Sequence, residues 1–351
     1  MDGKPRIGFV GVGGMGQCAH LKNYAALDGC EVVALAELRP ELAQRVAARY
    51  GVPNVYRDHR EMLAAETLDA IVASQPFRRH GVLVPELLEA GLPVFTEKPL
   101  AGSVEAGERI TAAVRGSDGR LMVGYNKRSD PATMSAKAEI DRLRDTGELG
   151  AMTYVRILMP PGDWIAGGFR DRITTDEPYP DVEEEPPASD MDEKTYKEYV
   201  AFVNYYIHQV NLLRHLLGEP YEVTYADPSG VLLAGKSAGG VPCTIEMAPY
   251  RTTVDWQESA LVCFEKGTVT LDLPAPLASN RPGRVEMLRD PGDGATPESV
   301  VPKLPWVHSM RQQAVNFIAV VRGEMPPLTD ADEALEDLKV AREYIRLWKG
   351  V

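Results

Sequence analysis

The chain has 351 residues, of which 44% are hydrophobic, and it carries a formal net charge of -13. This length suits two domains, because a single domain usually has about 100–200 residues. The acidic balance argues against binding to nucleic acid, whose phosphates demand clustered lysine and arginine, and against binding to an anionic membrane surface. The sequence has neither an apolar signal core nor the ~20 consecutive apolar residues of a membrane span, so we expect a cytoplasmic protein without nucleic-acid or membrane partners.

Cysteine and histidine spacing gives no sign of a disulfide scaffold or a metal site. The four cysteines, Cys18, Cys30, Cys243 and Cys263, are too few for a disulfide framework and too widely spaced for a CxxC motif. His208 and His215 lie seven residues apart without cysteine or carboxylate companions at ligand spacing. We therefore predict buried free thiols and no metal.

Short β-branched runs alternate with helical segments in the first third of the chain, which is the pattern of a doubly wound parallel sheet. Each connection is short, as right-handed crossovers require. The expected strands are residues 6–10, 31–36, 55–56, 69–73, 94–96 and 121–124, and the expected helices are residues 15–27, 39–50, 60–65, 79–90 and 103–114. This pattern predicts an α/β domain over residues 1–125.

Beyond residue 125, strands follow one another without intervening helices, which indicates a largely antiparallel sheet. Residues 264–268 have the character of a hairpin turn within it. The expected strands are residues 153–159, 221–226, 230–235, 241–248, 258–264 and 268–273, with helices over residues 135–146, 193–217, 307–322 and 330–349. We predict a second, α+β domain over residues 126–351, whose last helix is able to pack back on the first domain.

Residues 176–192 combine eight acidic residues with several prolines. Such a segment cannot form a packed element, so we predict a loop. Two interpretations stay open: a solvated surface loop, or a lid that attracts a cationic substrate.

A glycine-rich turn joins the first predicted strand to the first predicted helix. Its spacing, Gly11-x-Gly13-x-x-Gly16, is that of a dinucleotide fingerprint, and Glu37 ends the next strand, about 20 residues further on. The glycines let the backbone approach a pyrophosphate, while the helix N-terminus offers amide donors. We predict dinucleotide contacts from Gly11, Gly13, Gly14 and Met15, and contacts from Glu37 to the adenosine ribose.

The residues after the second strand bear on the choice of dinucleotide. Glu37 would repel a 2′-phosphate, which favours NAD. Arg39 is able to pair with that phosphate, so NADP remains the less favoured alternative.

Five motifs occur in order along most of the chain. They are Gly-Phe-Val-Gly-Val-Gly-Gly-Met-Gly at residues 8–16, Ala-Ser-Gln-Pro at 73–76 with His80, Glu-Lys-Pro-Leu at 97–100, Gly-Tyr-Asn-Lys-Arg at 124–128, and Gly-Glu-Leu-Gly at 147–150. His208 follows, three residues before Asn211. With these motifs the chain resembles the Gfo/Idh/MocA oxidoreductases, a family that includes inositol 2-dehydrogenase and glucose-fructose oxidoreductase.

The resemblance implies a Rossmann domain followed by a substrate-binding domain, and a homodimer or homotetramer formed through the outer face of the second sheet. It also implies hydride transfer between NAD and a CH–OH group. Besides the residues named above, the cofactor contacts that it implies are Ser74, Gln75, Pro76, His80, Glu97, Lys98 and Asn126.

The resemblance gives Lys98 contact with the reacting hydroxyl and makes His208 the general acid/base. An imidazole with an ordinary pKa of ~6.5 suits proton transfer, whereas a lysine near ~10.4 suits hydrogen-bond donation to a developing alkoxide. Family members commonly have an aspartate and a glycine where this chain has Asn204 and Tyr206. An asparagine cannot stabilise a protonated imidazole as a carboxylate does, so Lys98 is the second candidate base. The structural alternatives are an ion pair of Lys98 with Glu97 and a His208 that only packs.

Several residues of the second domain are candidates for substrate contact. Trp164 suits stacking on a sugar ring, and Asp163 suits binding of hydroxyl or ammonium groups. Arg128, Asn204 and Tyr206 complete the predicted set with Lys98 and His208. We predict an NAD-dependent dehydrogenase or ketoreductase acting on a sugar, aminosugar or cyclitol. The alternatives are an NAD-dependent glycosidase and a non-catalytic dinucleotide-sensing regulator.

Overall fold

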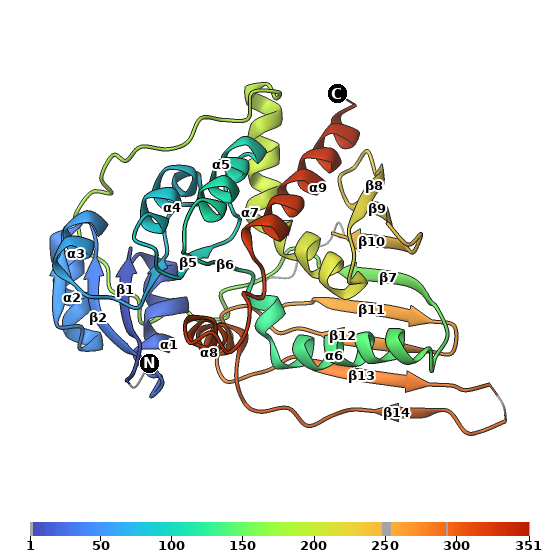
Figure 1. Ribbon diagram of the computed structural model, residues 1–351. Coiled ribbons are helices and arrows are strands. Elements are labelled where there is room, and N and C mark those ends of the chain that lie inside the picture. The colour runs from blue at the N-terminus through green and yellow to red at the C-terminus, as the bar shows by residue number, and fades with distance from the viewer. Residues whose placement is uncertain (1–2, 248–253, 293, 351) are drawn as a thin grey trace. The chain divides into compact units, whose positions relative to one another are not determined.

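The computed structural model describes residues 3–247, 254–292 and 294–350. These residues form two compact units whose boundaries interleave along the chain (Figure 1). Unit 1 comprises Met1–Tyr125, Gly167–Tyr196 and Met310–Leu338, and unit 2 comprises Asn126–Ala166, Lys197–Ser309 and Lys339–Val351. The sequence interpretation divided the chain once, at residue 125, whereas two later segments also belong to unit 1.

Unit 1 is built on a six-stranded sheet with the order β3-β2-β1-β4-β5-β6. All neighbouring strands are parallel, which confirms the predicted doubly wound sheet. The chain crosses over between β1 and β4, and this switch point is where open α/β sheets bind ligands. The strands are β1 (Arg6–Val10), β2 (Glu31–Ala36), β3 (Asn54–Tyr56), β4 (Ala70–Ala73), β5 (Val94–Glu97) and β6 (Leu121–Gly124).

The helices of unit 1 follow the predicted pattern, with local differences at their ends. The first is a π-helical segment, η1 (Gly16–Leu21), that continues into α1 (Lys22–Tyr24) and ends three residues before the predicted end. Side-chain caps at Asp58 and Ser103 satisfy backbone N–H groups of Glu61 and Ala106. The others are α2 (Pro40–Tyr50), α3 (His59–Ala65), the 3-10 turn η2 (Phe77–Arg79), α4 (His80–Leu88), α5 (Val104–Arg115) and α8 (Ser309–Val321).

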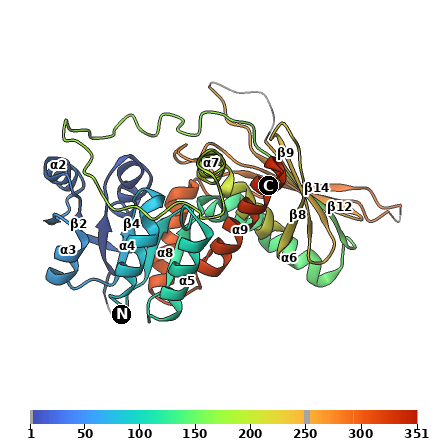
Figure 2. The same cartoon turned by 90° about the horizontal axis from the view of Figure 1, so that it is seen from above.

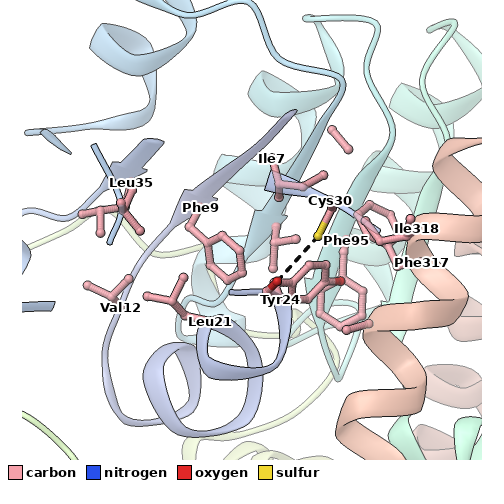
Figure 3. Close-up of a cluster of buried hydrophobic side chains, with 14 of the residues drawn as sticks. Ile7, Phe9, Val12, Leu21, Tyr24, Cys30, Leu35, Phe95, Phe317 and Ile318 are labelled. Atoms are coloured by element: carbon pink, nitrogen blue, oxygen red, sulfur yellow. Dashed lines mark hydrogen bonds between the residues drawn. The ribbon is translucent and has the colours of Figure 1, made fainter. Parts of the chain in front are cut away.

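An aromatic cluster in the core holds α8 in unit 1 (Figure 3). Phe317 packs edge-on against Phe95 of β5, with ring centroids 5.6 Å apart, and against Tyr24 at 6.5 Å. Tyr24 in turn meets Phe9 of β1 at 5.3 Å. Phe317 is fully buried, so a residue more than 200 positions from Phe95 completes the first domain's core.

Replacing Phe317 with alanine should therefore destabilise unit 1. Loss of a fully buried phenylalanine costs about 3–5 kcal/mol in the free energy of unfolding. Val315→Ala on the same helix is the control, because Val315 is 40% exposed and such surface changes stay within about 0.5 kcal/mol. Urea denaturation measures both, and equal midpoints for the two variants would contradict this packing.

Unit 2 is built on an eight-stranded sheet with the order β14-β13-β12-β11-β7-β10-β9-β8. Only the β10/β7 pair among the described strands is parallel, so the prediction of a mostly antiparallel sheet is confirmed. The strands are β7 (Met152–Leu158), β8 (Tyr221–Ala226), β9 (Leu232–Ser237), β10 (Pro242–Glu246), β11 (Ser259–Phe264), β12 (Gly267–Asp272), β13 (Arg284–Arg289) and β14 (Glu298–Val300). The sequence reading missed β13 and β14, and all three residues of β14 are exposed, which removes the hydrophobic alternation that predicts a strand.

One face of this sheet carries α6 (Pro131–Thr146), which lies along β12 and β13 (Figure 1). α6 begins four residues before the predicted start, because Asp130 caps the Ala132 N–H and Pro131 occupies the first turn. On the opposite face, the residues of β7 are half-buried and include Arg156, which pairs with Glu246 of β10. Helix η3 (Asn126–Ser129) belongs to unit 2, whereas α7 (Glu193–Leu217) and α9 (Ala331–Lys349) each begin in unit 1 and continue in unit 2.

Among the described residues, no helix is both long enough and apolar enough to cross a membrane. Cys18, Cys30 and Cys243 are buried free thiols as predicted, and Cys263 is a half-buried one.

Candidate functional site

The glycine loop lies at the carboxyl end of β1, at the switch point of the parallel sheet. Gly11 has φ +89°, and a Cβ there would lie 2.2 Å from Nε2 of Gln75. A Cβ on Gly16 would lie 2.4 Å from the Gly11 carbonyl oxygen. Gly13 differs, since its Cβ would meet only Arg39, at 3.8 Å. Gly11 and Gly16 are thus required by the fold, whereas the surface at Gly13 is open to a ligand, as a dinucleotide site requires.

Glu37 joins the end of β2 to the glycine loop. Its carboxylate is buried, with Oε2 accepting a hydrogen bond from the Val12 N–H at 3.0 Å. Oε1 accepts from Nε of Arg39 at 2.8 Å and from the Arg39 N–H at 3.2 Å. The hydrogen bond to Glu37 raises the pKa of Arg39. Glu37 and Arg39, the two residues that the sequence analysis connected with the choice between NAD and NADP, therefore form an ion pair with each other.

The loop after β4 lies against the glycine loop. The Ser74 N–H donates to the Val10 carbonyl at 2.9 Å, and the side chain of Gln75 accepts from Arg79 at 3.1 Å. Ser74 and Gln75 are half-buried and Pro76 is exposed. These residues line the carboxyl ends of β1 and β4, where the sequence reading predicted cofactor contacts.

His80 links the loops after β4 and β5. Its Nδ1 lies 3.0 Å from the Pro99 carbonyl oxygen, and Nε2 lies 3.3 Å from the Gln75 carbonyl oxygen. Burial lowers the pKa of His80, although hydrogen bonds to these carbonyls act in the opposite direction. A neutral, fully buried ring is suited to holding the loops together rather than to exchanging protons with a substrate.

The Glu-Lys-Pro motif begins at Glu97, the last residue of β5, and the Glu97 carboxylate is buried. Oε1 of Glu97 lies 2.5 Å from Nε2 of His20, and Oε2 accepts from the Lys98 N–H at 3.1 Å. Burial acts to raise the pKa of Glu97, but the hydrogen bond from His20 and the charge of Lys98 outweigh it and lower that pKa. The Lys98–Pro99 peptide bond is cis and Lys98 is half-buried. Sequence reasoning did not single out His20, which lies 77 residues before Glu97 and shares no motif with it.

Three residues of the motif at 124–128, namely 126–128, lie in unit 2, and Arg128 contacts α7. Nε of Arg128 donates to Oδ1 of Asn211 at 2.7 Å, and Nδ2 of Asn126 donates to Oγ of Ser309 at 2.8 Å. Both motif side chains are buried. His208 lies in α7 one turn before Asn211 and is half-buried. The structure thus brings Arg128 to the part of α7 that carries the predicted base.

A buried ion pair fixes the same part of unit 2, and sequence reasoning missed it. Nζ of Lys127 donates to Oε2 of Glu258, whose Oε1 accepts from Nε2 of Gln209 at 2.7 Å. Nε1 of Trp256 also donates to Glu258, at 3.2 Å. Gln209 is the neighbour of His208, so this network holds α7, η3 and the start of β11 together. Lys127 belongs to the motif at residues 124–128, but no motif or spacing in the sequence indicated that Glu258 would be its partner.

The predicted substrate residues of the loop after β7 are partly engaged within that loop. Oδ1 of Asp163 accepts from the N–H groups of Ile165 and Ala166, at 3.0 and 3.1 Å. The hydroxyl of Tyr205 accepts from the Gly162 N–H at 3.2 Å. Trp164 and Tyr206 are half-buried, and Asn204 is exposed.

Residues 167–192 form an extended strap across unit 1, without helix or strand (Figures 1 and 2). Gln17 exchanges hydrogen bonds with the backbone of Ile173, at 3.0 and 3.1 Å. The carboxylate of Glu185 accepts from the N–H groups of Gly81 and Gly102, beside the N-termini of α4 and α5. Glu184 pairs with Arg78 at 2.8 Å. The predicted loop is therefore anchored by its own acidic side chains, which no sequence motif indicated.

Burial raises the pKa of Glu185 to about 7, although the hydrogen bonds from Gly102 and Gly81 oppose that shift. A carboxyl group whose pKa is raised in the docked strap stabilises docking fully below its ordinary pKa near 4.5. That contribution is lost as the pH rises through 7.

We therefore expect hydrogen-exchange protection of residues 180–190, corrected for intrinsic rates, to be greater at pH 5 than at pH 8. Glu185→Gln should remove this difference, because the amide does not titrate. Glu184→Gln is the matched control and should keep it. An unchanged pH dependence in the Glu185 variant would contradict the assignment.

The open surface at Gly13 gives a second test. Gly13→Ala should fold with an unchanged thermal midpoint, since the added Cβ meets nothing closer than 3.8 Å. It should weaken NADH binding at least tenfold, because the methyl group occupies the approach of the pyrophosphate to the backbone. Fluorescence titration measures the affinity. A fully retained affinity would show that no dinucleotide phosphate lies there.

Among residues 3–247, 254–292 and 294–350, no group of three histidine, cysteine, aspartate or glutamate side chains is arranged to hold a metal ion.

Comparison with known proteins gives consistent matches. The family profile GFO_IDH_MocA, described as an oxidoreductase family with an NAD-binding Rossmann fold, matches residues 5–125. The inositol 2-dehydrogenase of Burkholderia lata is 30% identical over 258 residues, which are 69% of this chain and 66% of that enzyme, just under two thirds of its length.

Solved structures extend the similarity in fold to nearly the whole chain. A putative NADPH-dependent oxidoreductase from Desulfitobacterium hafniense has a TM-score of 0.75 at 14% identity, over 99% of this chain and 96% of that one. A levoglucosan dehydrogenase in complex with NADH and levoglucosan has a TM-score of 0.72 at 18% identity, over 99% and 98% of the two chains.

Proposed function

Because the chain belongs to the Gfo/Idh/MocA oxidoreductases, we propose that it is an NAD-dependent dehydrogenase or ketoreductase acting on a secondary hydroxyl of a sugar or cyclitol. One observation carries the proposal. Val10, Ala73 and Thr96 are register partners on β1, β4 and β5, so the glycine loop, Ser74 and Lys98 all follow at the same edge of the sheet. This edge is where parallel sheets bind dinucleotides.

Bound nicotinamide would supply the hydride acceptor or donor, and the chain's own groups would handle the hydroxyl and its proton. We assign Lys98 to donate a hydrogen bond to the reacting oxygen and stabilise its developing charge. We assign His208 to accept the hydroxyl proton, with Lys98 as the second candidate. The pairing of Glu97 with His20 supports this division, because it secures the backbone from which Lys98 extends.

The state of Glu37 supports NAD over NADP. Its carboxylate is buried at the end of β2 and already pairs with Arg39, the cation that would otherwise favour a 2′-phosphate. A 2′-phosphate near this pair would meet the Glu37 charge without an uncommitted Arg39 to offset it.

For the substrate, cyclitols and neutral sugars have the support of the inositol 2-dehydrogenase match. An amino-bearing substrate remains a narrower proposal, supported by the chain's net charge and by Asp163. The strap gives it less support than the sequence suggested, since Glu177, Glu184 and Glu185 are engaged with groups of unit 1. The dimer or tetramer and the cytoplasmic location stay predictions.

The experiment is a panel of cyclitols, sugars and aminosugars with NAD, followed by NADH absorbance. Lys98→Ala should lower kcat at least 10²-fold while the affinity for NAD stays within threefold, because the lysine acts on the hydroxyl. The kcat of His208→Ala should fall by a similar factor, because the proposed proton acceptor is removed. Lys22→Ala is the control lysine and should retain activity.

Other outcomes separate the alternatives. A glycosidase that oxidises its sugar only transiently would release product without net NADH. A dinucleotide sensor would bind NAD without turning over any member of the panel. Unchanged activity in Lys98→Ala would overturn the assignment of the catalytic lysine.

A further inference from the structure

The strap places a second carboxylate, Glu177, at the N-terminus of the helix that follows β2. Oε1 of Glu177 accepts from the Glu41 N–H and Oε2 from the Leu42 N–H, both at 2.9 Å. The hydroxyl of Thr175 also donates to Oε2, at 2.9 Å. These are amides of the first turn of α2, which helices leave without backbone partners.

The usual local cap is missing at this helix. Arg39 occupies the N-cap position and makes no side-chain cap hydrogen bond, so the capping acceptor comes from a residue 136 positions later. Desolvation acts to raise the pKa of Glu177, but the N–H groups of Glu41 and Leu42 outweigh it and hold that pKa below its ordinary value. The strap therefore carries a full negative charge to the helix N-terminus at neutral pH.

The same segment also contacts the neighbouring cation, Arg39. The guanidinium of Arg39 pairs with Glu37 at 2.8 Å, and its carbon atom lies 5.2 Å from the ring centroid of Tyr179. Two groups at the end of β2 are suited to holding a phosphate, namely Arg39 and the first-turn amides of α2. Glu37 pairs with Arg39, and Glu177 accepts the hydrogen bonds of the α2 amides.

We propose that Glu177 is a specificity-determining residue, which disfavours NADP by occupying with its own carboxylate the α2 amides that a 2′-phosphate would need. The proposal rests on the proposed function, since it requires a dinucleotide at the glycine loop with its adenosine ribose at Glu37. It adds that cofactor choice depends on a segment outside the βαβ unit. A 2′-phosphate has to displace the strap and leaves Glu177 without its donors, whereas the free 2′-hydroxyl of NAD does neither.

The test is the ratio of the Kd for NADP to the Kd for NAD, measured by titration calorimetry on the full-length protein. Wild type should prefer NAD. Glu177→Ala should lower the ratio at least tenfold by strengthening NADP binding, with the Kd for NAD within threefold. Glu177→Gln, which removes the charge but keeps the size, should change the ratio in the same direction and covers the case in which the alanine variant does not fold.

Asp176→Asn is the matched control. It removes one negative charge from the adjacent, exposed position, and its ratio should stay within twofold of wild type. An equal change in this control would mean a general charge effect and would overturn the proposal. An unchanged Kd ratio in both Glu177 variants would also overturn the proposal. An equal weakening of NAD and NADP binding would overturn it too, because Glu177 would then only anchor the strap. Failure of wild type to bind either dinucleotide would instead overturn the proposed function.

Discussion

The parallel register of β1, β4 and β5 is the constraint on which the candidate site of unit 1 depends. Because Val10, Ala73 and Thr96 are partners across these strands, three loops from distant parts of the chain begin at the same level. Their backbones then come so close that Gly11 has no room for a Cβ. The close approach leaves backbone amides and one open glycine surface where a phosphate is best held.

Buried charges secure the loops on which the candidate catalytic residues lie. Glu97 is paired with His20 in unit 1, and Lys127 is paired with Glu258 in unit 2. A buried charge is tolerated only with a partner and further hydrogen bonds, so each pair restricts the backbone around it to one arrangement. Glu97 directly precedes the proposed catalytic Lys98, and Glu258 also accepts a hydrogen bond from Gln209, the neighbour of His208.

The acidic strap shows how the same composition leads to different roles once the chain is folded. As a sequence, residues 176–192 are a proline-containing acidic run, for which solvation is the ordinary expectation. In the structure, Glu177 and Glu185 accept hydrogen bonds from N–H groups at or beside helix N-termini. The N–H groups of the α2 N-terminus lower the pKa of Glu177, as the helix dipole favours, whereas burial raises the pKa of Glu185. The helices of a doubly wound domain begin at the ligand-binding edge, so a strap that caps them also lies along that edge.

Much of unit 1 follows from local signals. Hydrophobic runs, the proline at the start of α2 and the glycine spacing predict the six parallel strands and the turn at Gly11, because these signals act over a few residues. The exposed strand β14 carries no such alternation and could not be predicted in this way.

The sequence by itself therefore determined the two fold classes, the family and the motifs that contain Lys98 and His208. Tertiary structure decided which charges meet. His20 joins Glu97, Glu258 joins Lys127, and Glu177 joins the first turn of α2 across 136 positions. The physical reason is that a hydrogen bond depends on distance in space, whereas periodicity and spacing report only on neighbours along the chain.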